Sequence, residues 1–495
     1  MRKSTLIAVV TAASTLALPA PALAAVDAGG SSYSSAEGAS SFTSVVGADG
    51  RVYAVGAVGT GAFTVAVLGG SGIENATVIE VTAAEGHDGI YGAAEVAAQS
   101  DGTIVAVFGT AIGTALFRVD PSSLALVGSN WDDSCGTSPV GVAVGTSGDA
   151  LDHIFVASYP GSDYSSCPGT VINRYDASGG GVAWGDGTDG GHDIGDQHLD
   201  TSIFASDVTI DGSGRVIAAG GSDGENRVGI LRTTADGEAD AGFGDGAGTY
   251  AGNVYIDAPG VPPTEGVNFG FMPKAANGAI GYVPQTFHSE QAMAVVTDDA
   301  GRIYLTGSTC EAIDTAADKR CTSVARAWVM RLTSDGTLDA SFGDGGIAEL
   351  ESAAGFALYT TDLAVSGDGR IAVTGYASDD VAGLWAGTAT AKLFVGLLES
   401  DGSASSDAGS DGVWVEELAD PTVHQGATSV SFVTGGTLAV SGKRVDGSAS
   451  TAFVRLLTVD GTVTTNPGGG DTGGGDTGGD TGGGGDTGGD TGGGT

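Results

Sequence analysis

Residues 369–375 read GRIAVTG, and the same kind of phrase recurs along the chain. Its apolar, β-branched centre is bounded by glycine, which is typical of a strand entered from a tight turn. Short apolar runs precede and follow it, such as residues 363–365 and 413–415. Seven copies can be quoted, at residues 49–56, 101–107, 148–157, 214–220, 301–307, 369–375 and 436–442.

A unit of four short strands that recurs seven times predicts a β-propeller. One such sheet cannot bury both of its faces, whereas successive sheets packed around an axis can. We therefore expect an all-β fold of seven four-stranded blades, closed into a ring by residues 26–34 or 460–465. A β-solenoid and paired sandwiches are the competing all-β folds, and long, unequal loops argue against the solenoid. The sequence shows no long amphipathic helix pattern, which argues against an α/β fold.

A longer phrase accompanies two of the copies. Residues 331–346 read RLTSDGTLDASFGDGG, and residues 232–246 keep the same Arg, Asp-Gly and Phe-Gly spacing. Residues 184–187 carry a weaker version in which Trp replaces Phe. Asp-Gly pairs fit tight turns, and the Phe is suited to packing between neighbouring sheets.

This phrase resembles the hallmark of the delta-60 repeat proteins, a group of exported bacterial proteins with propeller-type repeats. The resemblance is specific in two units and weak in the first two. It implies a propeller fold and export to the cell surface or beyond. It implies no set of catalytic residues.

The two ends of the sequence differ from the repeats. Arg2 and Lys3 precede an apolar run, and Ala22-Leu23-Ala24 offers a small-residue cleavage site, which together predict a secretory signal peptide. We expect a signal peptide over 1–24, a propeller domain over 25–465 and a disordered Gly/Asp/Thr-rich tail over 466–495. The mature protein would be a secreted or cell-surface monomer without a transmembrane segment, and its tail a spacer or a surface stalk.

The charge of the chain limits its partners. Sixty acidic residues against 19 basic ones give a formal net charge of −41. Such a field repels nucleic acid and anionic lipid headgroups, so neither is expected as a partner. An extracellular glycan or protein is the expected kind of partner.

Four cysteines are present, and an even number in an exported chain predicts disulfide bonds. Proximity in the sequence favours a Cys310–Cys321 pair, which leaves Cys135 and Cys167 for the second bond. A zinc site is the alternative, but the sequence has no Cys-x-x-Cys pair.

Loop lengths indicate where a ligand would bind. Residues 159–169, 257–287, 308–324 and 376–389 form long connections that follow either the second or the fourth strand of a unit. In an antiparallel blade both kinds of connection emerge on one side of the ring, which we name the long-loop face. Binding residues gather on such loops. Three histidines stand just before innermost strands on this face and are binding candidates: His87, His288 and His424.

One segment is crowded with acidic residues, histidine and glycine. Carboxylate oxygens on a glycine-rich loop suit Ca²⁺, although the spacing matches no EF-hand loop. An ordinary acidic surface loop is the outcome we expect, and calcium is the one cofactor considered. The candidate ligands are Asp186, Asp189, Asp193, Asp196 and Asp200.

The sequence contains no H-E-x-x-H helix or P-loop. Our first hypothesis is therefore an exported, non-enzymatic binding or surface-interaction module that uses the long-loop face. The alternative is a propeller hydrolase or lyase that acts on an extracellular polymer through carboxylates or histidines near the axis. Buried, converging titratable groups there would favour the enzyme, and an open, solvated funnel would favour binding.

Overall fold

The computed structural model describes residues 32–34, 41–69, 72–84, 86–132, 136–160, 171–184, 196–198, 203–222, 227–244, 252–257, 292–310, 313–314, 320–321, 325–381, 389–409, 411–418, 420–433, 437–447 and 449–458. The expected signal peptide and tail lie outside these residues. So do several candidate residues: Cys135, Cys167, Asp186, Asp189, Asp193, Asp200 and His288.

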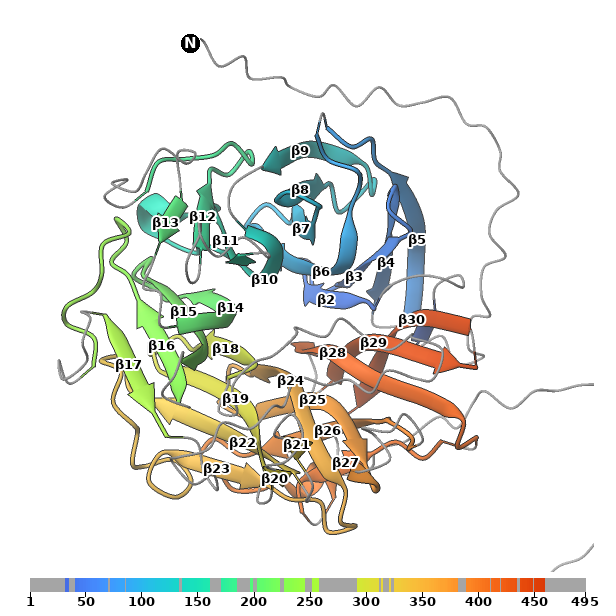
Figure 1. The fold of residues 1–495 in the computed structure, drawn as a ribbon, viewed down its shortest axis with the longest axis vertical. Helices are drawn as coiled ribbons and strands as arrows, with labels where there is room; N and C mark the ends of the chain where they lie inside the picture. Colours follow the sequence, from blue (N-terminus) through green and yellow to red (C-terminus); the bar gives the residue numbers. More distant parts are fainter. Residues whose placement is uncertain are drawn as a thin grey trace, which may run out of the picture.

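Seven four-stranded antiparallel sheets form a ring, which confirms the predicted fold (Figure 1). The first three blades are β2(Thr43–Val46), β3(Val52–Val58), β4(Ala62–Gly69), β5(Gly72–Glu80); β6(Tyr91–Ala98), β7(Ile104–Gly109), β8(Thr114–Val119), β9(Leu126–Asp132); and β10(Gly136–Val144), β11(Ile154–Pro160), β12(Val171–Tyr175), β13(Asp196–His198). The next three are β14(Ile203–Ile210), β15(Val216–Ser222), β16(Val228–Arg232), β17(Asn253–Ile256); β18(Ala294–Thr297), β19(Ile303–Cys310), β22(Ala325–Leu332), β23(Ile347–Leu350); and β24(Ala357–Val365), β25(Ile371–Ser378), β26(Lys392–Leu398), β27(Val413–Val415).

The seventh blade joins the two ends of the described chain. It contains β28(Val423–Val433), β29(Thr437–Asp446) and β30(Ala449–Thr458), and its outermost strand is β1(Ser32–Ser34). Tyr33 pairs with Val454 in this sheet. The N-terminal segment 26–34, one of the two expected sources, therefore supplies the closing strand.

The core lies between neighbouring blades. One cluster combines Tyr53 and Phe63 of the first blade with Ile104 and Phe117 of the second, all almost completely buried. Because the second strand of each blade is covered on both faces, its sequence is a continuous apolar run rather than an alternating one. This is why the glycine-bounded runs were visible in the sequence.

The recurring Arg and Phe also act between blades. Phe342 is fully buried, and the Arg331 guanidinium lies 4.7 Å from the centre of its ring. Arg331 donates to Asp339 and, at 2.6 Å, to the carbonyl oxygen of Ser400 in the next blade. The Phe therefore packs between neighbouring sheets, as its position in the phrase predicts.

The fourth and third blades repeat this arrangement. Arg232 lies 4.3 Å from the ring centre of Phe243 and donates to the carbonyl oxygen of Ser334 in the fifth blade. In the third blade Trp184 replaces the Phe, and its indole nitrogen donates to the carbonyl oxygen of Ala235 at 3.1 Å. The degenerate copy thus keeps a link to the next blade with a different donor.

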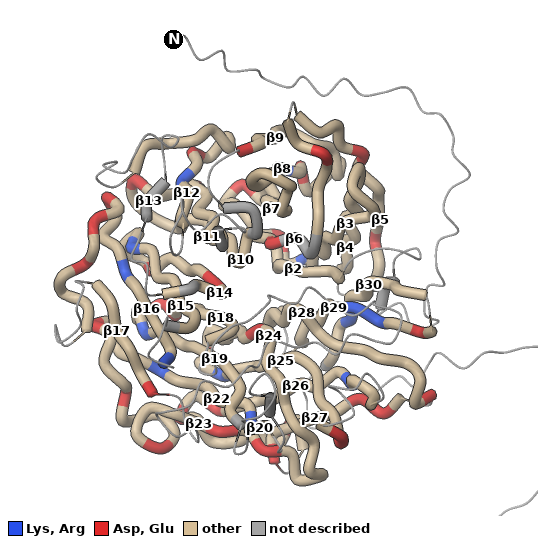
Figure 2. The backbone as a smooth tube through the Cα atoms, viewed as in Figure 1, with Lys and Arg blue, Asp and Glu red and all other residues tan. Residues whose placement is uncertain are grey.

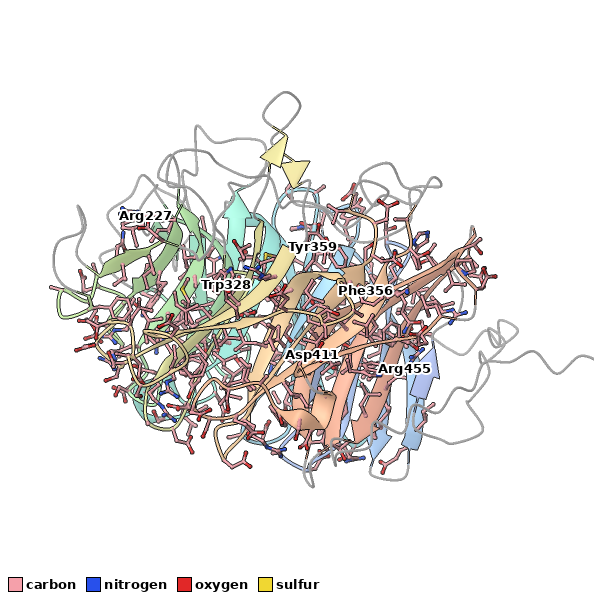
Figure 3. All side chains as sticks on the ribbon, turned by 90° about the horizontal axis from the view of Figure 1, so that it is seen from below. Arg227, Trp328, Phe356, Tyr359, Asp411 and Arg455 are labelled. Carbon is pink, nitrogen blue, oxygen red and sulfur yellow. The ribbon has the colours of Figure 1, made fainter. Side chains whose placement is uncertain are left out.

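A small hairpin rises from the long-loop face. It consists of β20(Ile313–Asp314) and β21(Arg320–Cys321), between the second and third strands of the fifth blade, and it projects from one side of the ring (Figure 3). Two short 3₁₀ turns also occur, η1(Gly148–Ala150) and η2(Ser406–Ala408). Within the described ranges, no helix is long and apolar enough to cross a membrane.

Candidate functional site

Three acidic side chains occupy equivalent positions on innermost strands, and we name them the axial carboxylates: Glu95 on β6, Asp207 on β14 and Asp362 on β24. Their partners on the second strands are Val107, Ala219 and Thr374, at the same place in each second strand. They belong to the second, fourth and sixth blades, no two of which are neighbours. All three are partly exposed, midway along strands that surround the axis (Figure 1).

Asp207 directly follows a β-bulge in β14. The pairing register of β14 shifts between Ala205 and Asp207, which interrupts the regular ladder. The Asp207 carboxylate accepts the N–H of Val208 at 2.7 Å through Oδ1. Through Oδ2 it accepts the N–H of Val295 on β18, at 2.8 Å. The side chain therefore connects the fourth blade to the fifth.

Asp362 repeats the arrangement two blades later. The register of β24 shifts between Thr360 and Asp362. The carboxylate accepts the N–H of Leu363 at 2.8 Å and the N–H of Val430 on β28 at 2.8 Å. Asp362 therefore connects the sixth blade to the seventh.

Two other blades have an uncharged residue at the position equivalent to Asp207 and Asp362. Ser429 holds the equivalent position in the seventh blade, and its hydroxyl accepts the N–H of Ser44 on β2 at 2.9 Å. In the third blade the position is Gly141, where a Cβ would lie only 2.6 Å from the Asp207 carboxylate. Glycine at this point gives the Asp207 side chain its room.

Burial raises the pKa of every axial carboxylate. It raises the pKa of Asp207 to about 7, against the opposing effect of the two N–H donors. Burial raises the pKa of Asp362 to about 8, and the charge of Asp207 adds to this shift. Burial, and then the charges of Asp207 and Asp362, raise the pKa of Glu95 well above its ordinary value. Each carboxylate is negatively charged when it loses its proton, so the three repel one another across the axis although their blades are not neighbours.

These three residues were not predicted from the sequence, although a signal was present. Each stands the same number of residues before the first residue of its second strand, namely Ile104, Val216 or Ile371. An alignment of the seven units on those strands would have shown an acidic residue recurring inside an otherwise apolar strand.

The predicted histidines lie apart from the axial carboxylates in the fold. His87 precedes β6, its Nδ1 lies 2.9 Å from the Thr110 hydroxyl, and its ring centre lies 5.2 Å from that of Trp131. His424 is on β28, where its Nδ1 accepts the N–H of Ala391 at 3.3 Å, and burial lowers its pKa. His288 lies outside the described residues.

An exposed patch surrounds His87 on the long-loop face of the second blade. Tyr91 is 40% exposed and Ile112 is 43% exposed, whereas most large apolar side chains of the protein are buried. Trp131 lies partly exposed beside His87. We name His87, Tyr91, Ile112 and Trp131 the blade 2 patch.

Of the predicted calcium ligands, only Asp196 falls within the described residues. It lies on β13, paired with Asn173 of β12. In the described part of the chain, no three His, Cys, Asp or Glu side chains come together closely enough to hold a metal ion.

Solved structures with a distantly similar backbone include three that differ widely in kind. Aldose sugar dehydrogenase of Streptomyces coelicolor, in its PQQ-bound form, is 13% identical over 73% of this chain and 93% of its own, with a TM-score of 0.35. The Cps50 (Swd1) β-propeller domain of Myceliophteria thermophila is 9% identical over 85% and 98%, with a TM-score of 0.41. Drosophila semaphorin 1b, extracellular domains 1–2, is 11% identical over 87% of each chain, with a TM-score of 0.42. At these values the likeness carries no argument about function.

No curated protein matches the sequence. One family of domains does match part of it: residues 212–243 and 323–342 fit a domain of unknown function, DUF5122, which is described as a β-propeller. The two segments end at Phe243 and Phe342, in the same two units that carry the Arg/Phe phrase. The match supports a propeller-repeat family for this chain, in agreement with its seven blades.

Proposed function

We propose that the protein is an exported, non-enzymatic binding module that holds an extracellular glycan on its long-loop face. The observation that carries this proposal is the blade 2 patch. It offers the exposed Tyr91 ring and Ile112 side chain beside the partly exposed imidazole of His87, whose Nδ1 lies 2.9 Å from the buried Thr110 hydroxyl. Sugar rings combine apolar C–H faces with hydroxyl groups, so they suit a surface that combines aromatic and hydrogen-bonding side chains.

A matched pair of substitutions tests which face binds. Ile112→Asp changes the long-loop face, and Leu151→Asp makes the same change on the turn between β10 and β11, on the opposite face. The two side chains have similar exposures, 43% and 46%, so both variants should fold equally well. On a glycan array, we expect Ile112→Asp and Tyr91→Ala to weaken binding at least tenfold and Leu151→Asp to leave it unchanged.

Two results would contradict this proposal. Equal losses in the Ile112→Asp and Leu151→Asp variants would remove the long-loop face as the site. A protein that binds no glycan on the array, but captures an extracellular protein, would make the ligand class wrong.

A second candidate function is hydrolysis or elimination on an extracellular polymer, and the axial carboxylates favour it. Carboxyl groups that keep a proton near neutral pH are suited to general acid catalysis. However, both oxygens of Asp207 and of Asp362 already accept backbone N–H groups, as structural carboxylates do. Binding therefore stands first. Release of reducing ends or unsaturated products from a polysaccharide panel, abolished by Glu95→Gln, would establish the enzyme instead.

Export, a bacterial source and a relation to the delta-60 repeat proteins are part of the same proposal. The N-terminal pattern and the Arg/Phe phrase support them. N-terminal sequencing of protein from the culture medium tests export, and we expect the mature chain to begin at Ala25.

A further inference from the structure

The three axial carboxylates place negative charge on alternate blades of the ring. Glu95, Asp207 and Asp362 lie at equivalent positions on the innermost strands of alternate blades, and two of them connect their own blade to the next. Beyond the effect of burial, the charges of Asp207 and Asp362 raise the pKa of Glu95, and the charge of Asp207 raises the pKa of Asp362. The equivalent positions in the other four blades are uncharged: Thr43, Gly141, Ala294 and Ser429. Among the described residues, none of these three carboxylates forms an ion pair with a basic side chain.

The strands packed against β6, β14 and β24 supply few compensating groups. Their cationic side chains are Arg232, Arg326 and Arg331, and each is already engaged by an acidic side chain: Asp240, Glu351 and Asp339 respectively. Burial raises the pKa of Tyr53, Tyr304 and Tyr376 on those strands. Cys310 on β19 is expected to be in a disulfide. Among the described residues of those strands the one histidine is His424, and burial lowers its pKa.

We propose that the propeller ring is a pH-sensitive assembly, held together more tightly in mildly acidic than in alkaline solution, because protonation of the axial carboxylates removes repulsion between alternate blades. The hydrogen bonds of Asp207 and Asp362 place this effect at the junctions between blades. Above neutral pH the same side chains that connect the blades also repel each other across the axis.

The sign follows from proton binding. An unfolded chain releases these protons near pH 4, whereas the folded protein retains them until about pH 7 for Asp207 and about pH 8 for Asp362. Between those limits the folded state binds more protons, so the free energy of unfolding falls as pH rises. His424 acts in the opposite direction, because a lowered histidine pKa makes the folded state gain stability as pH rises. A test must therefore compare variants, not pH values alone.

Thermal unfolding of the mature chain between about pH 5 and pH 8.5 tests the proposal. Glu95→Gln removes one axial charge with little change of shape, and among the described residues Glu95 has no hydrogen-bonded partner to lose. Glu80→Gln is the matched control, because it removes the same charge from an exposed position on β5. We expect Glu95→Gln to raise the melting temperature by roughly 2–4 °C at pH 8.5 and by much less at pH 5. Glu80→Gln should give a small shift that is the same at both pH values.

A second variant and a second measurement distinguish the charge effect from a general loss of stability caused by the substitution. Asp362→Asn gives up one acceptor, so its melting temperature should fall at pH 5, yet its pH dependence should be flatter than that of the wild type. Calorimetry near pH 6.5, in buffers with different ionisation enthalpies, should show proton release on unfolding, and less of it in both axial variants. Parallel pH profiles for wild type, Glu95→Gln and Asp362→Asn, or unfolding without proton release, would overturn the proposal.

Discussion

Arg331 shows how one side chain can hold two blades together. Its side chain is only 4% exposed, it pairs with Asp339, and it reaches the Ser400 carbonyl across the blade boundary. Replacing it removes the donor from Oδ2 of Asp339 and from the carbonyl oxygen of Ser400, and it uncovers one face of Phe342. Losses of this kind are costly because the remaining polar groups are shielded from water.

We expect Arg331→Leu to lower the free energy of unfolding by roughly 2–4 kcal/mol, measured by denaturant titration. Arg227→Leu is the matched control, since Arg227 and its partner Asp257 are 43% and 65% exposed. An exposed pair contributes at most about 1 kcal/mol. Equal losses in the two variants would mean that the buried repeat arginine contributes no more to stability than an exposed ion pair.

Glycine 336 illustrates a second requirement of the repeat. Its φ is +89°, and a Cβ there would lie 2.6 Å from the ring of Phe243 in the preceding blade. Gly345 also has a positive φ, +65°, but a Cβ there would meet nothing within 4 Å. An alanine at Gly345 would therefore introduce backbone strain alone, whereas an alanine at Gly336 would introduce strain and a collision with Phe243.

Gly345→Ala should destabilise the protein by about 1–2 kcal/mol through the left-handed backbone alone. Gly336→Ala should cost clearly more, because the Phe243 ring must also move. Denaturation midpoints with matched slopes would measure the difference. If Gly345→Ala proved as harmful as Gly336→Ala, the close contact between blades would have no energetic role.

The residues that pack between blades were easier to predict from the sequence than the residues of the candidate site. Phe342 was predicted to pack between neighbouring sheets because a large apolar ring at a fixed position of a repeat is suited to burial there. Glu95, Asp207 and Asp362 were missed because acidic residues are abundant here, and their significance depends on three non-adjacent blades facing one axis. The blade 2 patch likewise arises from segments, around His87, Ile112 and Trp131, that only the fold brings together.

At the scale of elements, second strands were predictable and outermost strands were less so. Buried on both faces, a second strand such as β25 is a continuous apolar run with glycine at its ends. The outermost strands β1, β13 and β27 have three residues each, and of these three only β27 is apolar. The closing strand was assigned to one of two segments because a ring needs its ends joined, and the pairing of β1 with β30 decides between them.

The β20–β21 hairpin provides a test of the predicted disulfides. Cys310 ends β19 and Cys321 ends β21, so the two cysteines bracket the chain that enters and forms the hairpin. A Cys310–Cys321 bond would stabilise the protein by roughly 2–3 kcal/mol by closing a short loop in the unfolded chain. We expect peptide mapping without reductant to show this pair and Cys135–Cys167, and Cys310→Ser to lower the stability by about that amount. Free thiols or crossed pairs would refute the pairing.

At the scale of the whole molecule, charge is the dominant feature. Acidic residues are spread around the entire ring, and basic ones are few (Figure 2). Many of the acidic residues serve the turns: Asp401, for example, accepts the N–H and the hydroxyl of Ser403, and these bonds lower its pKa. The turns thus use negative charge locally, while the summed charge opposes compactness.

This opposition predicts that salt stabilises the protein. A formal charge of −41 repels itself over long distances at low ionic strength, where the Debye length is about 30 Å in 10 mM salt. We expect the melting temperature to rise with NaCl and to level off above roughly 0.1–0.2 M, where the Debye length is about 8–10 Å. Calcium chloride at equal ionic strength separates screening from binding, because an ion that binds the folded state adds a shift that grows with its concentration. Coincident NaCl and CaCl₂ curves would leave residues 186–200 as an acidic surface loop. An extra calcium shift that Asp193→Ala reduces would establish a site there, and a melting temperature independent of salt would contradict the electrostatic argument itself.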